Sequence, residues 1–195
     1  MTVSTHTSKA SVRSRAEARA RILQATRDEL AESGWRKFSV DKVARTAKAS
    51  KQTIYRWWPS ISKMCLEAGL ELIPEAHQQG RDPVERIAAL IQPLETAVRT
   101  GAGHSVIRAA LIAASDDAAA AEVWRAWLKD HIRHPLRLIL AELATRKVLR
   151  RDVDLDSAVE LLTGSLWTRL LILRAPLPED FSQTQAAILL REFAA

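Results

Sequence analysis

The segment spanning residues 51–57 concentrates side chains whose chemistry suits contact with nucleic acid. Lys51 and Arg56 can neutralise phosphates or donate to guanine, and Gln52 can pair with adenine. Thr53 offers a hydroxyl and a methyl group, while the hydroxyl of Tyr55 can reach a phosphate. An ordinary solvent-exposed amphipathic helix could carry the same residues, so the interpretation depends on the elements around them.

Those elements have the spacing of a helix-turn-helix. A first helix is expected over residues 40–47, with Ser39 as its N-cap. A second is expected over residues 51–57, with Ser50 as its N-cap, and Pro59 prevents it from continuing. Only a short turn separates the two helices, as in DNA-binding motifs of this kind.

Positive charge is concentrated around this motif. Residues 1–60 contain 13 Lys and Arg against 5 Asp and Glu, whereas residues 61–195 contain 16 against 18. Phosphate binding requires such a local excess of cations, because each neutralised phosphate releases counterions and adds salt-dependent affinity. A basic face kept only for solubility would not be confined to one end of the chain. The expected partner is therefore double-stranded DNA.

Four segments of this region carry a more specific pattern. They are RIL at 21–23, AESGW at 31–35, FSVDKVA at 38–44 and SKQTIYRWWPS at 50–60. Together they resemble the TetR family of bacterial transcriptional regulators, strongly over roughly residues 15–70. The resemblance implies an all-helical homodimer with a three-helix DNA-binding domain and a larger C-terminal domain that dimerises and binds an inducer. It further implies a repressor that a small molecule releases from a near-palindromic operator.

The residues expected to contact DNA all lie on or beside the two helices: Ser39, Lys42, Lys48, Lys51, Gln52, Thr53, Tyr55, Arg56, Trp57 and Lys63. Two positions depart from the family pattern. Lys48 stands at the turn position usually taken by Gly, so a bulky residue must adopt a positive φ at a cost of about 1 kcal/mol. Ile61 stands where the family usually has Lys. The cation that usually contacts the DNA backbone at that position is therefore missing, and Lys63 is the nearest one.

The composition predicts an all-α fold in three parts. Ala, Leu, Arg and Glu dominate, and the alternation typical of strands is rare. Residues 1–14 are expected to form a disordered arm, residues 15–59 the helix-turn-helix domain, and residues 60–195 a helical domain for ligand binding and dimerisation. Three basic residues near the first boundary could add DNA contacts: Lys9, Arg13 and Arg15.

Capping and breaking signals divide the chain into helices. Besides the motif itself, helices are expected over residues 15–33, 60–79, 83–100, 104–114, 116–147, 154–174 and 178–193. Gly101 and Gly103 are expected to separate the helix that ends at residue 100 from the one that begins at residue 104. Pro135 removes one helical hydrogen bond and predicts a kink near His131.

Two apolar stripes near the C-terminus are candidates for a dimer interface. The residues recur at three- and four-residue steps: Leu155, Val159, Leu162, Leu166 and Leu170, followed in the last helix by Ile188 and Phe193. A dimer is favoured because the two DNA-binding helices of a dimer must lie about 34 Å apart, one turn of the duplex, to contact two half-sites. The alternative is that both stripes complete the core of the monomer.

The sequence gives the least information about a ligand pocket. Trp124, Trp127 and His131 share one face of the kinked helix, and Trp167 could approach from the next one. Such aromatic residues with one titratable group could enclose a largely apolar inducer. His104 and Met64 are weaker candidates for the same pocket, and the alternative for all of them is plain core packing.

Other chemistries find little support in the sequence. His131 and His134 have a spacing suited to two metal ligands, but no further ligands accompany them, so neither a metal nor a cofactor is expected. No nucleophile elbow or phosphate-binding glycine loop is present, which argues against an enzyme. A single Cys, no signal-like segment and no apolar stretch long enough for a bilayer suggest a cytoplasmic protein.

The sequence therefore favours a ligand-responsive, dimeric DNA-binding repressor. One alternative is a helix-turn-helix regulator that responds to no ligand. A less favoured alternative is a helical enzyme or adaptor whose basic head contacts something acidic.

Overall fold

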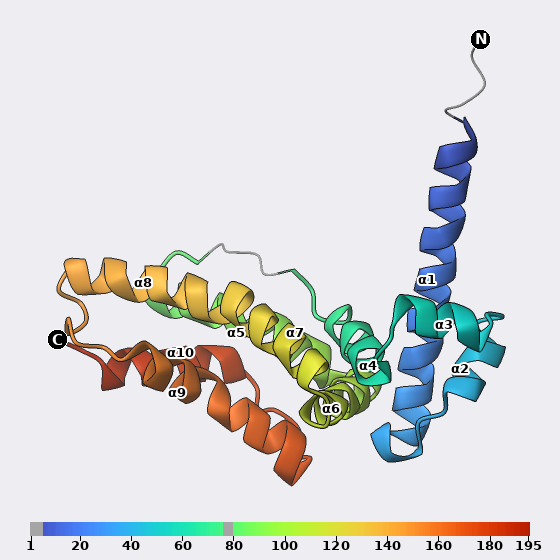
Figure 1. Cartoon of the computed structure of the whole chain (residues 1–195). Helices are drawn as coiled ribbons and strands as arrows, with labels where there is room; N and C mark the ends of the chain where they lie inside the picture. The colour runs from blue at the N-terminus through green and yellow to red at the C-terminus, as the bar shows by residue number, and fades with distance from the viewer. Residues whose placement is uncertain (1–5, 76–79) are drawn as a thin grey trace. The chain divides into compact units, whose positions relative to one another are not determined.

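The computed structural model describes residues 6–75 and 80–195, and these ranges are almost wholly helical or joined by short turns (Figure 1). Their only strand-like pairing is an isolated bridge between Leu149 and Ala194. The all-α prediction is confirmed. Within the same ranges, every helix is too short or too polar to cross a bilayer.

The chain forms two compact units. The first holds the residues up to Glu71 together with Ser105–Ala121, and the second holds Leu72–His104 together with Glu122–Ala195. The first unit contains these elements in order: α1 (His6–Ser33), η1 (Trp35–Lys37), α2 (Val40–Thr46), α3 (Lys51–Trp57), α4 (Ile61–Leu70), most of α6 (Gly101–Ser115) and the start of α7 (Ala118–Leu128).

The core of the first unit lies where α1, α2, α3 and α4 meet. α1 packs against both α2 and α4, and α2 packs against α3. The completely buried side chains at this junction come from all four helices: Ile22, Leu23, Val43, Ile54 and Met64. The short helices of the motif are therefore held by tertiary packing, which an isolated helix of seven residues could not replace.

α6 approaches this unit very closely where it crosses α4. A Cβ atom added to Gly69 would lie 2.8 Å from the Cβ of Ala110, so only glycine permits this approach. The expected boundary at residue 60 does not coincide with the division of the structure, since α4 and most of α6 belong to the same compact unit as the helix-turn-helix.

The second unit is a helical bundle built on α5 (Pro83–Arg99). Besides the rest of α7, it contains η2 (Lys129–Arg133), α8 (His134–Thr145), α9 (Leu155–Trp167), η3 (Thr168–Leu173) and α10 (Phe181–Glu192). α5 packs against α8 and α10, and α10 also packs against α9. Asp82 begins α5 by accepting the Glu85 N–H at 2.9 Å, and Asp154 begins α9 by accepting the Ser157 N–H at 2.8 Å.

The irregularity expected near His131 takes the form of a π-helix. η2 interrupts the segment between α7 and α8, and the His134 N–H donates to the Lys129 carbonyl, five residues earlier. Pro135 follows directly and cannot donate, so the helix widens to accommodate the missing bond. The predicted position of the disruption is confirmed.

Several expected helix ends are wrong. α1 begins at His6, so the part of the expected disordered arm from His6 to Ser14 is helical, while residues 1–5 and the side chain of Lys9 lie outside the part that the structure describes. α4 ends at Leu70 rather than near residue 79, and the structure does not describe residues 76–79. α10 starts at Phe181 rather than Pro178.

The expected break between two helices is present, but it lies at Thr100 rather than at the glycines. α6 begins at Gly101, and Thr100 caps it by accepting the Gly103 N–H at 3.0 Å. A hydroxyl placed directly before the glycines supplies the first acceptor of the helix, so the two glycines join its first turn.

Most of the expected dimer stripe is core. Leu162, Leu166 and Leu170 are at most 1% exposed, and Phe193 is also buried within the single chain. These residues cannot present a surface to a partner, which corrects their assignment. Leu155, Val159 and Ile188 are only half-buried and keep part of their side chains accessible.

The start of α10 depends on a carboxylate from another helix. Asp180 precedes the helix in a left-handed conformation and gives no side-chain cap. Instead Glu95 of α5 accepts the Ser182 N–H at 2.9 Å and pairs with Arg99, which also donates to the Pro178 carbonyl at 2.9 Å. Burial alone would raise the pKa of Glu95, but the hydrogen bonds from Ser182 and Arg99 outweigh it and lower this pKa.

We expect Glu95→Gln to destabilise the protein by about 1–3 kcal/mol at pH 7, because a charge-assisted cap is removed. A carboxyl group with a lowered pKa stabilises the fold above its unfolded value of about 4.3, and this contribution disappears as the pH falls through the folded value. Urea unfolding at pH 7 and pH 3.5 should therefore show a difference between the proteins that shrinks in acid. The control is Glu160→Gln on the exposed side of α9. An equal loss at both pH values would contradict this account.

Candidate nucleic-acid interface

The two helices of the motif are capped as the sequence predicts. The Ser39 hydroxyl accepts the Lys42 N–H at 3.3 Å, and the Ser50 hydroxyl accepts the Thr53 N–H at 3.1 Å. Lys48 in the turn has a φ of 51°, which confirms that a non-glycine residue takes the left-handed conformation here. The turn thus fixes α3 relative to α2.

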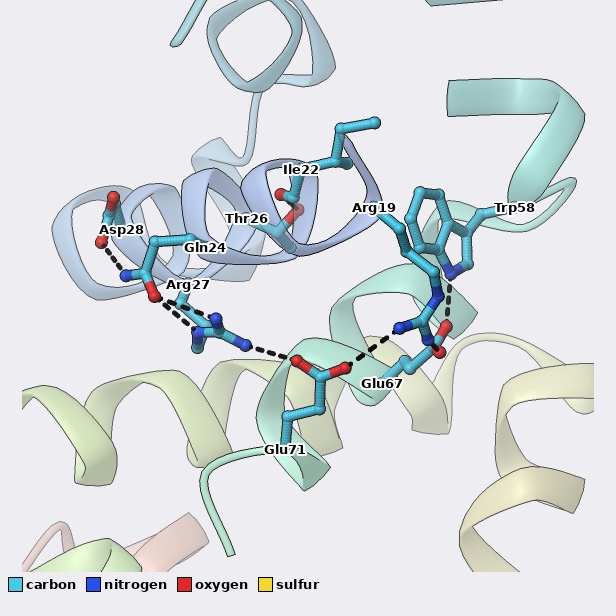
Figure 2. A network of polar contacts seen from close by, with 9 residues as sticks. All are labelled: Arg19, Ile22, Gln24, Thr26, Arg27, Asp28, Trp58, Glu67 and Glu71. Carbon is cyan, nitrogen blue, oxygen red and sulfur yellow. Dashed lines mark hydrogen bonds and ion pairs between the residues drawn. The ribbon is translucent and has the colours of Figure 1, made fainter. Parts of the chain in front are cut away.

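Two buried side chains attach α3 to the unit. Ile54 is fully buried and Trp58, which directly follows the helix, is 3% exposed. The indole N–H of Trp58 donates to Glu67 of α4, and this carboxylate also pairs with Arg19 of α1, as Figure 2 shows. The guanidinium of Arg19 lies 5.7 Å from the centre of the Trp58 ring, in reach of a cation–π interaction.

A second carboxylate extends this network along α1. Glu71, just after α4, pairs with Arg19 at 3.3 Å and with Arg27 at 2.9 Å (Figure 2). Arg27 in turn donates to Gln24, which donates to Asp28. The end of α3, the last part of α4 and the middle of α1 are therefore joined by one set of ionic and hydrogen bonds.

The opposite side of α3 is open to solvent. Gln52, Tyr55 and Arg56 are exposed, with Tyr55 at 48%. Within the described ranges, the Arg56 guanidinium takes part in none of the ion pairs. An amide, a phenol and a free guanidinium on one short helix are suited to base edges and phosphates.

Two of the lysines expected to contact DNA already hold carboxylates. Lys42 pairs with Glu29 and Glu32, each at 2.8 Å, and Lys51 pairs with Asp41 at 2.5 Å. Hydrogen bonds to Glu29 and Glu32 raise the pKa of Lys42, and the bond to Asp41 raises the pKa of Lys51. Either ammonium group would have to exchange an internal partner for a phosphate.

The remaining expected residues have mixed surroundings. The Thr53 hydroxyl lies 2.9 Å from the Ser50 hydroxyl, so its polar group faces the cap of the helix. Lys48 and Lys63 are exposed, whereas Ser39 is half-buried at its cap. Lys63 uses its backbone N–H to cap α4 through Ser60, which leaves its side chain accessible.

A groove between α1 and α3 extends the candidate interface beyond the motif. It is lined by Ser14, Arg15, Ala18, Thr53, Arg56 and Trp57. The Arg15 guanidinium lies 5.8 Å from the centre of the half-buried Trp57 ring. The basic residues near the N-terminus indicated that Arg15 could add a DNA contact, but its position beside α3 could not be inferred from them.

The four aromatic residues expected to line a ligand pocket do meet in the second unit. Trp124 stacks on Trp127 at 5.2 Å between ring centres, and Trp127 stacks on His131 at 4.6 Å. Trp167 meets Trp124 edge-on at 5.5 Å. The cluster is largely half-buried, apart from the exposed His131, and its rings cover one another. Plain packing accounts for this cluster as well as a pocket does.

The weaker pocket candidates lie elsewhere. Met64 is fully buried in the core of the first unit, beside Ile22 and Ile54, which removes it from the expected pocket in the other unit. His104 is half-buried at the start of α6, and its Nε2 has no hydrogen-bond partner among the described residues.

Comparison with known proteins agrees with this geometry. Residues 22–68 match the family described as bacterial regulatory proteins of the tetR family, and residues 81–188 match the tetracyclin repressor-like C-terminal domain. An uncharacterized HTH-type transcriptional regulator of Mycobacterium bovis is 31% identical over 167 residues, which cover 83% of this chain and 80% of that protein. The chain belongs to the TetR family.

A further relative and two solved structures are also similar to this chain. The regulator YdeS of Bacillus subtilis is 29% identical over 77% of both chains. The crystal structure of the TetR family transcription regulator SCO0332 has a TM-score of 0.60 at 26% identity and covers 92% of this chain and all of that one. A TetR regulator from Agrobacterium tumefaciens has a TM-score of 0.63 at 18% identity, covering 91% of this chain and 94% of that one. This TetR-family protein is thus a helix-turn-helix transcriptional regulator and not an enzyme.

We expect Glu67→Ala to weaken the first unit by about 1–3 kcal/mol, because it leaves the buried indole N–H of Trp58 without an acceptor. Glu71→Ala is the matched control, since it removes only partly exposed ion pairs and should cost less than about 1 kcal/mol. Urea unfolding followed by tryptophan fluorescence would measure both. Equal losses for the two variants would show that the bond to Trp58 contributes nothing particular.

Proposed function

We propose that this TetR-family protein is a ligand-responsive repressor, which binds a near-palindromic operator as a homodimer and leaves it when a small molecule binds. The observation that carries the DNA-binding part is the exposed face of α3, with Gln52, Tyr55 and Arg56 free of internal ionic partners in the described ranges. The match of residues 81–188 to a tetracyclin repressor-like C-terminal domain supports the ligand-responsive part.

The side chains on this face are suited to different parts of the DNA. Gln52 is suited to a base edge, and Arg56 to a phosphate or guanine. Arg15, across the groove from Arg56, extends the positive surface along α1. Lys51 contributes less net charge than Arg56, because Asp41 already neutralises it.

A route from α6 to the DNA-binding helices lies within the first unit. At the junction of α6 and α7, Asp116 accepts the Trp35 indole N–H and Asp117 accepts the Ser60 hydroxyl, both at 3.0 Å. Ser60 is the N-cap of α4, directly after the segment that ends α3. A shift of this junction would therefore act on α4, and α4 holds Trp58 through Glu67. We infer that this is how a ligand alters the placement of the reading helix.

The accessible apolar residues of η3 support a dimer. Ile172 and Leu173 are 75% and 62% exposed, although both are large and apolar. They directly continue α9, whose Leu155 and Val159 are only half-buried. A second copy covering this face would remove the exposed apolar surface from water.

A regulator that responds to no ligand is the second candidate. It is favoured by the aromatic cluster, in which Trp124, Trp127 and Trp167 pack against one another. Thermal-shift screening of the DNA-free protein with small molecules separates the two, because only a ligand-responsive protein should be stabilised.

The DNA-binding proposal is tested with an operator selected from a random duplex library. We expect Arg56→Ala to reduce the slope of log K against log salt by about 0.9 for each phosphate that Arg56 neutralises. Gln52→Ala should cost about 1–3 kcal/mol and relax the preference at one base pair in each half-site. Fluorescence anisotropy at several salt concentrations measures both effects.

Arg151→Ala, on an exposed turn far along the chain from the motif, is the control and should bind as the wild type does. Selection of no preferred sequence, or unchanged binding by both motif variants, would refute the assignment of α3 as the reading helix.

The dimer is tested at Ile172. Ile172→Lys should shift the protein toward monomer in sedimentation velocity, because a buried charge without a partner opposes association. Val148→Lys, which changes another exposed apolar side chain outside η3, should leave the dimer intact. A wild-type monomer, or an unaffected dimer in the Ile172 variant, would contradict this surface.

A further inference from the structure

A pocket of about 500 Å³ lies in the second unit beside the π-helix η2. Arg86 and Leu90 line it from α5, Asp130 from η2, and His134, Pro135 and Leu138 from η2's continuation into α8. Its volume lies within the range of about 300–1,000 Å³ that small-molecule sites occupy. It does not include any residue of the aromatic cluster.

One side of the pocket is apolar. Of its lining residues, Leu90 and Ile139 are buried and Leu138 is 54% exposed. Leu138 is among the few large apolar side chains that remain so open to solvent in the described ranges. A hydrocarbon or aromatic group seated here would cover it and gain stabilisation from the area removed from water.

The other side of the pocket offers acceptors. The carboxylate of Asp130 takes part in none of the ion pairs found in the described ranges. Because the His134 N–H donates to the carbonyl five residues earlier, the donor that Pro135 lacks is the one for the Asp130 carbonyl. π-helices of this kind are frequent at functional sites.

The cation in the pocket is already neutralised. Arg86 pairs with Glu142 at 2.7 Å, and this pairing raises the pKa of Arg86 and lowers the pKa of Glu142. An anionic ligand would therefore meet a compensated guanidinium and the uncompensated carboxylate of Asp130. A ligand with a positively charged donor would meet two kinds of acceptor.

We propose that this pocket binds primary amines that carry an apolar body, and that such an amine is the inducer of this TetR-family protein. The ammonium group donates to Asp130 and to the carbonyl freed by Pro135, and the apolar body lies against Leu90 and Leu138. The second half rests on the proposed function, whereas binding of the amine does not.

The π-helix also connects the pocket to the junction of α6 and α7 through the chain itself. η2 directly continues α7, and α7 begins after Asp117, which accepts the hydroxyl of Ser60 at the start of α4. An amine bound at η2 would thus lie on the chain segment that leads, through α7, to that junction.

The test compares three ligands with one apolar body. 4-Phenylbutylamine, 4-phenylbutanol and 4-phenylbutanoate are titrated into the full-length chain at pH 7 by isothermal calorimetry. The amine should bind at least tenfold more tightly than the alcohol and the acid. Equal affinity for all three, tightest binding of the acid, or no binding of the amine would overturn the proposal.

Two variants locate the site. Asp130→Asn should weaken the amine at least tenfold and leave the alcohol unchanged, while Leu138→Ser should weaken all three ligands. Asp152→Asn, which changes an exposed carboxylate in the turn before α9, is the matched control and should bind as the wild type does. An amine affinity that Asp130→Asn leaves unchanged would place binding elsewhere and refute the site.

A second measurement separates the two halves of the proposal. The amine is added to the complex with the selected operator, and release is followed by fluorescence anisotropy. Release from the wild type but not from the Asp130→Asn variant supports the inducer role. Binding by calorimetry without release would refute that role and keep the site, and a chain that binds no operator would refute the proposed function alone.

Discussion

The hydrogen bond from the Trp58 indole to Glu67 is the interaction on which the placement of α3 depends. α3 has seven residues, too few to be stable without tertiary support. Ile54 anchors its middle by burial, and Trp58 fixes its end. Because Glu67 also pairs with Arg19, one carboxylate joins α1, α3 and α4. The open face of α3 is thus presented by a network on its opposite side.

Features governed by neighbours in sequence were predictable. The caps at Ser39 and Ser50 depend on a side chain and an N–H three residues later, and both form as expected. The positive φ of Lys48 follows from its place in the short turn. Helix ends were less predictable where a cap competes with a breaker, as Thr100 does with the glycines that follow it.

Features that depend on partners distant in the sequence were not predictable. Periodicity identified the apolar stripe of α9, but burial by other helices decides that Leu162 is core and Val159 remains accessible. In the DNA-binding motif, the lysines were recognised and their internal carboxylates were not, since Glu29 lies on another helix. The aromatic cluster was predictable from one helix face, whereas the pocket at Arg86 and Asp130 requires knowledge of how α5 packs.

The carboxylates that hold Lys42 and Lys51 have a consequence for how a regulator searches a chromosome. They act as counterions built into the protein, so fewer free ions are released when these lysines approach a phosphate. Association with arbitrary sequence is then weaker than the number of cations suggests. A protein that holds random DNA loosely dissociates from it more readily, so the carboxylates that pair with Lys42 and Lys51 favour release from DNA that offers only phosphates.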